Sequence, residues 1–140
     1  MKNDVLIKFI TIQTTEDNDS DTLEINARGT LEKSDSGYII EYSEIDEEMQ
    51  GSKTTVSVDS PDCITMTREG SYNSRFIIEK GKRHSCYYDT PAGSLMMGVF
   101  ASDVSVKLTE NGGKLKMKYT IDFNSSMVAE NSVTLSVKKI

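Results

Sequence analysis

From residue 104 to the C-terminus, apolar and polar residues alternate along the chain with a period of two. Three apolar series occupy residues 104–108, 115–123 and 133–137, with turn signals at 111–113 and 124–126. This period places successive side chains on opposite faces of a β-strand, one toward a core and one toward water. The pattern predicts consecutive antiparallel strands around one core. The residues expected to face that core include Val104, Leu115, Met117, Tyr119, Ile121, Phe123, Leu135 and Val137.

The preceding part of the chain carries shorter runs of the same kind, with turn signals about every eight to twelve residues. The runs cover residues 4–15, 23–32, 38–44, 54–59, 63–68, 72–79, 84–90 and 94–101. No long segment has a helical period, and the run of hairpins has no long crossover. Residues 1–140 are therefore predicted to form a single all-β domain. We expect an antiparallel up-and-down barrel of roughly eight to ten strands, because closure removes exposed sheet edges.

Two local features in these runs predict irregularities. The run 4–15 is apolar on both faces, which indicates either a bulge or a strand covered on both sides. Gly29 interrupts the apolar series of residues 23–31, which indicates a bend or a bulge.

Length and cysteine content limit the class of protein. A chain of 140 residues has the size of one domain, and its two cysteines, Cys63 and Cys86, lie inside strand-like runs. The N-terminus lacks the pattern of an export signal, and no apolar run approaches the ~20 residues of a membrane span. The sequence therefore predicts a cytoplasmic protein with two reduced thiols and no membrane partner.

The net charge of −6 disfavours binding to phosphate backbones. The lysines fall on alternate strand positions and do not form a sequence cluster interleaved with aromatic residues. Nucleic acid is therefore not an expected partner. The oligomeric state is left open by the sequence.

Four short segments resemble a known family. They are Tyr42-Ser43-Glu44, Arg68-x-Gly70, Tyr88-x-Thr90-Pro91-x-Gly93-x-Leu95 and Leu115-x-Met117-x-Tyr119. In this order they resemble the YwiB-like family, a group of small bacterial proteins of unknown function. The resemblance implies a calycin-like or lipocalin-like β-barrel, and it implies no established activity, cofactor or catalytic residue.

A candidate site follows from the alternating directions of antiparallel strands. If successive strands are neighbours, the ends of the runs at Glu44, Arg68 and Thr90 meet at one mouth of the barrel. Tyr42, Tyr72 and Tyr88 lie near the same mouth. We therefore take Arg68, Glu44, Tyr42, Tyr72, Tyr88 and Thr90 as candidate ligand-binding residues.

Arg68 and Glu44 both fall on apolar strand faces, so both charges are expected to point inward and to need partners. One interpretation is an internal ion pair between them that plugs the mouth. Another is that Arg68 receives an anionic group, since a guanidinium presents a planar fork suited to carboxylate or phosphate. In a third, a bulge turns both residues outward.

Catalytic and metal chemistry find little support in the sequence. His84 is the single histidine, and the strand count places it at the opposite end of the barrel from Arg68. One histidine and two distant cysteines make a poor zinc site. We predict no enzyme activity, no cofactor and no metal site.

Two functional hypotheses remain. In the first, the barrel binds a small anionic or amphipathic molecule at the Arg68 mouth. Its interior would be lined by Tyr42, Met66, Phe76, Met117 and Tyr119. The alternative is a structural or regulatory protein-interaction domain with a filled core. The size of the interior cavity separates the two hypotheses.

Overall fold

The fold consists of ten β-strands. The computed structural model describes residues 2–15, 19–35, 37–43, 53–70, 73–90, 93–123 and 126–140. The strands are β1 (Lys2–Thr15), β2 (Ser20–Lys33), β3 (Tyr38–Ser43), β4 (Lys53–Ser60), β5 (Cys63–Glu69), β6 (Asn73–Glu79), β7 (Arg83–Thr90), β8 (Gly93–Thr109), β9 (Gly112–Phe123) and β10 (Ser126–Lys139).

These strands form one closed antiparallel barrel. Each strand pairs with the next along the chain, and β1 pairs with both β2 and β10 to close the ring. The predicted all-β, up-and-down barrel is confirmed.

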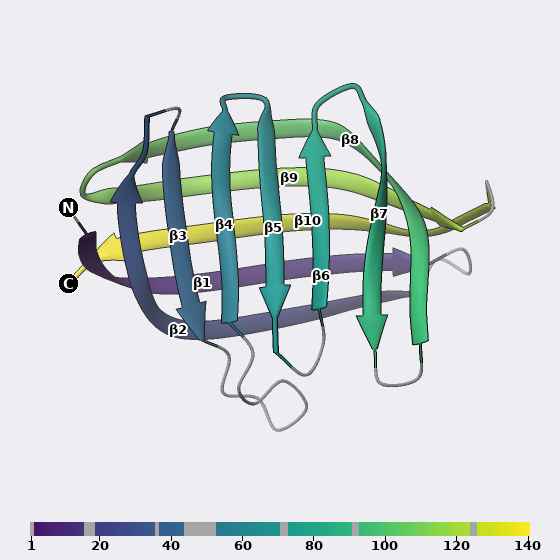
Figure 1. The fold of residues 1–140 in the computed structure, drawn as a ribbon, viewed down its shortest axis with the longest axis horizontal. Helices are drawn as coiled ribbons and strands as arrows, with labels where there is room; N and C mark the ends of the chain where they lie inside the picture. The colour runs from purple at the N-terminus through teal and green to yellow at the C-terminus, as the bar shows by residue number, and fades with distance from the viewer. Residues whose placement is uncertain are drawn as a thin grey trace.

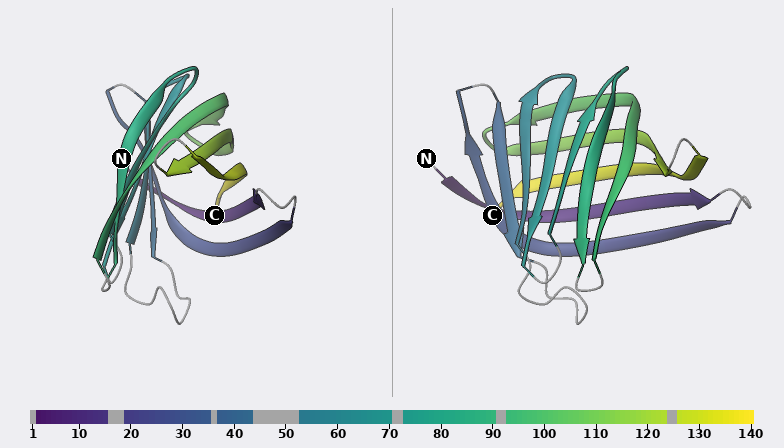
Figure 2. Two further views of the ribbon diagram at one scale, coloured as in Figure 1. Left: turned by 90° about the vertical axis from the view of Figure 1, so that its right-hand side faces the viewer. Right: turned by 45° about the vertical axis from the view of Figure 1, so that its right-hand side comes forward.

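The barrel is flattened into two layers that cross each other. In Figure 1 the short strands β3 to β7 stand upright in front, the long strands β9, β10 and β1 run across behind them, and β8 and β2 bend from one layer to the other. Figure 2 shows β2 curving from the rear layer toward β3. Side chains from the two inner faces pack against each other, as in orthogonal sheet packing. Fully buried members of this core include Val5, Leu31, Ile40, Val56, Ile64, Ile78, Val99, Leu115 and Leu135.

β8 differs from the sequence prediction. Residues 94–101 and 104–108 appear as separate runs in the sequence, but they belong to one strand with a register shift between Ala101 and Asp103. A β-bulge adds one residue to one strand and so changes the phase of the inward face. Ala101 and Val104 are therefore both buried, although they are three residues apart.

Phe123 was expected to face the core, but its side chain is exposed. It is the last residue of β9, paired with Ser126 at the start of β10. Leu115, Met117 and Tyr119 on the same strand are buried as predicted.

β1 keeps a continuous register with both of its neighbours, so the predicted bulge is absent from its described residues. Val5, Ile7 and Phe9 face the core. On the outer face Leu6 and Ile12 are 46% and 44% exposed. Within the described part of the chain, the apolar outer side of β1 is therefore only partly covered.

Gly29 lies where β2 begins to pair with β3, and both of its ladders are continuous, so the bulge that the sequence offered is absent there. It is opposite Val5 of β1 and Tyr42 of β3. A Cβ atom at this position would overlap the carbonyl oxygen of Glu41 and lie 2.9 Å from Cβ of Tyr42. Only glycine allows the two strands to approach this closely.

The first prediction concerns this close approach. Gly29→Ala should lower the free energy of unfolding by about 1–3 kcal/mol, because the added methyl group forces backbone atoms apart. Urea denaturation checks the effect, with Arg28→Ala on the exposed outer face as the control. Equal stability of the two variants would show that the close approach of β2 and β3 at Gly29 tolerates a side chain.

Candidate functional site

A row of partly polar side chains crosses the inner face of the short strands. The pairs Tyr42–Thr54, Thr54–Arg68, Arg68–Ser74 and Ser74–Tyr88 are in direct register across β3 to β7. Directly opposite residues on antiparallel strands project from the same face of the sheet. Tyr42, Thr54 and Ser74 are buried, so this row faces the barrel interior.

A second set of polar residues faces this row from the rear layer. Gln13, Asn131 and Tyr119 are in register across β1, β10 and β9. Asn131 and Tyr119 are buried. Both layers of the barrel therefore contribute polar side chains to the same part of the interior, which we call the polar level.

A cavity of about 230 Å³ lies between the two sets. The volume corresponds to roughly eight water molecules at about 30 Å³ each. Phe9, Met66 and Phe76 supply apolar walls, while Gln13 and the exposed Leu23 lie where the cavity reaches the end of the barrel. Of the interior lining proposed from the sequence, Met66, Phe76 and Tyr119 line this cavity, and Tyr42 and Met117 are buried outside its lining.

Arg68 is the one charged residue in the described lining, and its Nε atom is buried. Its positive charge acts on the phenol of Tyr119. Burial raises the pKa of Tyr119 to about 12, and the Arg68 charge opposes part of that rise. The two groups therefore share the same poorly solvated space.

The structure brings together three of the residues predicted for the site. Tyr42, Arg68 and Tyr88 lie in the same row, on three of the five neighbouring short strands. Glu44 and Tyr72 lie outside the described residues, as does the side chain of Thr90, whose backbone ends β7. Ion pairing between Arg68 and Glu44 stays a prediction.

The sequence reasoning missed Thr54, Ser74 and Asn131. Each extends an apolar inward series by one step, before Val56, Phe76 and Val133 respectively. For Thr54 and Ser74 the signal was a polar residue in phase with the buried face at the second position of a strand, whereas Asn131 lies in the interior of β10.

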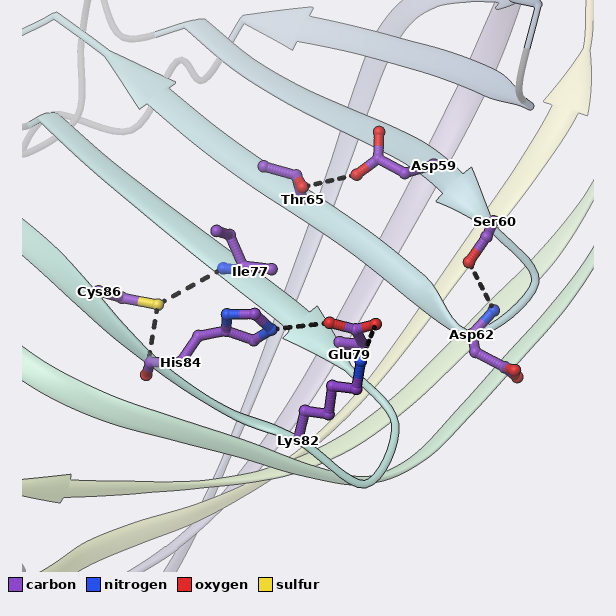
Figure 3. A network of polar contacts seen from close by, with 9 residues as sticks. All are labelled: Asp59, Ser60, Asp62, Thr65, Ile77, Glu79, Lys82, His84 and Cys86. Atoms are coloured by element: carbon purple, nitrogen blue, oxygen red, sulfur yellow. Dashed lines mark hydrogen bonds and ion pairs between the residues drawn. The ribbon is translucent and has the colours of Figure 1, made fainter.

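A second polar network lies on β4 to β7, toward the opposite end of the barrel (Figure 3). His84 Nε2 is 2.9 Å from Glu79 Oε1, and Lys82 Nζ is 3.5 Å from Glu79 Oε2. The Ile77 amide donates to Cys86 Sγ at 3.5 Å, and the Cys86 thiol in turn lies 3.9 Å from the His84 carbonyl oxygen. The backbone pairing of β6 with β7 ends at Arg75, so the Cys86 sulfur serves as the acceptor for the Ile77 amide.

Electrostatics argue against nucleophilic chemistry at this network. The hydrogen bond from His84, followed by the charge of Lys82, lowers the pKa of Glu79. Burial raises the pKa of the Cys86 thiol, which keeps sulfur in its less reactive protonated form. Cys63 and Cys86 are both free cysteines, in agreement with the predicted absence of a disulfide.

Asp122 of β9 is paired with Arg83 of β7. Both of its oxygens accept hydrogen bonds from Arg83, at 3.0 and 2.6 Å. The guanidinium passes over Gly98, where a Cβ atom would overlap it.

Within the described ranges, no cluster of three or more His, Cys, Asp or Glu side chains is placed to hold a metal ion. The same ranges contain no helix that is long and apolar enough to cross a membrane.

The protein is therefore a closed, ten-stranded antiparallel barrel whose interior cavity is lined in part by polar side chains. The chain belongs to the family described as "Domain of unknown function (DUF1934)", whose model matches residues 7–135. It is similar in fold to the crystal structure of the YwiB protein from Bacillus subtilis, with a TM-score of 0.88 and 15% identity, over 99% of this chain and 93% of that one. The resemblance to YwiB is thereby confirmed. No curated protein sequence matches the chain.

The second prediction concerns Tyr119. The unfolded chain loses this phenolic proton near pH 10 and the folded chain near pH 12, so the folded state binds more protons in between. The free energy of unfolding should fall over this interval, by about 2–3 kcal/mol at about 1.4 kcal/mol per pKa unit. In Tyr119→Phe the free energy of unfolding should lack this contribution to its decrease with pH.

Urea unfolding between pH 9.5 and 12 measures this effect. Tyr87→Phe, which alters an exposed phenol, is the matched control. An unchanged pH slope in Tyr119→Phe would contradict the buried position of the phenol.

Proposed function

We propose that the barrel binds one small anionic or amphipathic molecule in the interior cavity, with the anionic group at Arg68. The observation that carries the proposal is a guanidinium within the lining of an interior cavity. A guanidinium offers paired donors to carboxylate or phosphate. Such a role is that of lipocalin-like barrels, which hold one small ligand inside the sheet.

The distribution of polarity around the cavity supports an amphipathic ligand. Arg68, Thr54 and Ser74 supply polar groups from the short strands. Phe9 and Phe76 supply aromatic walls for an apolar part of the molecule. The volume of about 230 Å³ favours a compact ligand, because drug-sized pockets begin at about 300 Å³.

The same small volume supports one alternative, a structural or regulatory interaction protein with a filled core. In that case Arg68 stabilises the interior through its predicted ion pair with Glu44. Replacing both residues with apolar residues of similar size should then leave the free energy of unfolding unchanged or raise it. We place either role in the cytoplasm, which two free cysteines support.

The third prediction tests the binding role. Protein purified without denaturation should carry a small anionic molecule, detected by native mass spectrometry and released on unfolding. Arg68→Met should weaken its binding by about 10- to 100-fold, the equivalent of a charge-assisted hydrogen bond. Arg75→Met is the matched control, because Arg75 is exposed on the outer face of β6.

Three outcomes decide between the two functions. Loss of the molecule in Arg68→Met but not in Arg75→Met supports the binding role. Equal retention in both variants would show that the molecule lies elsewhere. A wild-type protein with no bound molecule, together with a Glu44→Gln and Arg68→Met pair whose effects on stability do not add, would favour the filled core.

A further inference from the structure

The outer face of the long strands gathers positive charge that the sequence shows only as scattered lysines. Lys107 is opposite Lys114 across β8 and β9, and Ser136 of β10 lies between Lys114 and Lys8 of β1. Lys116 and Lys138 project from the same side, Lys116 at the next outward position of β9 after Lys114 and Lys138 at the next outward position of β10 after Ser136. We call the set of Lys8, Lys107, Lys114, Lys116 and Lys138 the basic face.

This concentration of charge is unfavourable for the isolated barrel. Like charges directly opposite each other on neighbouring strands destabilise a sheet, and Lys107 and Lys114 form such a pair. Among the residues that the structure describes, Lys8 has an ion pair, at 3.3 Å with Glu24, and the other four lysines of the basic face have none. The chain as a whole has a net charge of −6, so a patch of five lysines contrasts with the overall charge of the protein.

The basic face is also hollow. A depression of about 590 Å³ is lined by Lys8, Lys107, Lys114, Lys138 and Leu6, among others. A second depression of about 640 Å³ shares Leu6 and continues to Arg28 and Ser43. Together they form a groove that has a half-exposed leucine in its floor and cations on both sides.

We propose that this groove binds an extended acidic segment of a partner protein, with carboxylates against the lysines and one apolar side chain over Leu6. Charge complementarity selects an anionic partner. A recessed apolar floor favours a peptide over a lipid bilayer, because a flat bilayer surface cannot follow a groove. The described lining contains no aromatic side chain on which nucleic acid bases could stack.

The site is separate from the interior cavity, since Lys8 and Leu6 project from the outer face of β1. The test can therefore use the whole protein without altering Arg68. The probe is a fluorescein-labelled peptide of glutamates around a central leucine, and binding is followed by fluorescence anisotropy. Affinity should fall steeply with added salt, because exposed charges are screened.

The test variant is Lys107→Glu with Lys114→Glu. The control is Lys33→Glu with Lys80→Glu, which changes the net charge by the same amount at exposed positions outside the basic face. We expect the test variant to bind the probe at least about tenfold more weakly than wild type, and the control to stay within about twofold. Lys107→Gln with Lys114→Gln should give an intermediate loss, and Leu6→Ser should weaken binding at constant charge.

Circular dichroism confirms that each variant folds. Equal affinity of the test and control variants would overturn the proposal, as would absence of probe binding by the wild type at low salt. Duplex DNA and phosphatidylglycerol vesicles are measured in parallel. If either binds through the lysines of the basic face while the peptide does not, the acidic-segment assignment is wrong.

Discussion

Closure of the sheet through β1 is the constraint on which the structure depends. β1 is paired along its length with both β2 and β10, although β10 is the last strand of the chain. A round barrel of ten strands would leave a lumen wider than side chains can fill. Flattening into two crossed layers brings the inner faces into contact, and β2 curves from one layer to the other. The interior is then packed over most of its length and hollow at one level.

The polar level of the barrel depends on register. One step inward from the row that contains Arg68, the same strands contribute Ile40, Val56, Met66 and Phe76, again directly opposite one another. A slip of one residue on any strand would turn its side chain outward, and a slip of two would exchange a polar for an apolar level. The alignment of Thr54, Arg68 and Ser74 therefore requires the tight β4–β5 turn and the short β5–β6 connection. A half-buried Arg68 with a buried Nε atom is tolerated because neighbouring strands place polar side chains around it.

The sequence predicted what depends on short-range patterns and missed what depends on pairing between distant strands. Alternation alone identified the strands and the inward position of Arg68. The bulge in β8 was missed because Ser102 resembles a turn residue between two runs. Asn131 was missed because its polar character suggests solvent, and only the closed topology shows that it faces the cavity opposite Thr54. The lysines of the basic face seemed scattered for the same reason, since Lys8 joins Lys114 only through β10.

β1 contributes to both proposed sites, and its geometry indicates that they are independent. Phe9 and Gln13 line the cavity and Lys8 lines the groove, and successive side chains of a strand point to opposite faces of the sheet. Because β1 is locked on both sides by continuous ladders, a ligand in the cavity has no hinge through which to move the groove. The affinity of the acidic peptide should therefore be the same, within about twofold, for wild type and Arg68→Met. A larger difference would mean that β1 shifts as a unit when the cavity is filled, and the barrel would then link its interior to a partner on its surface.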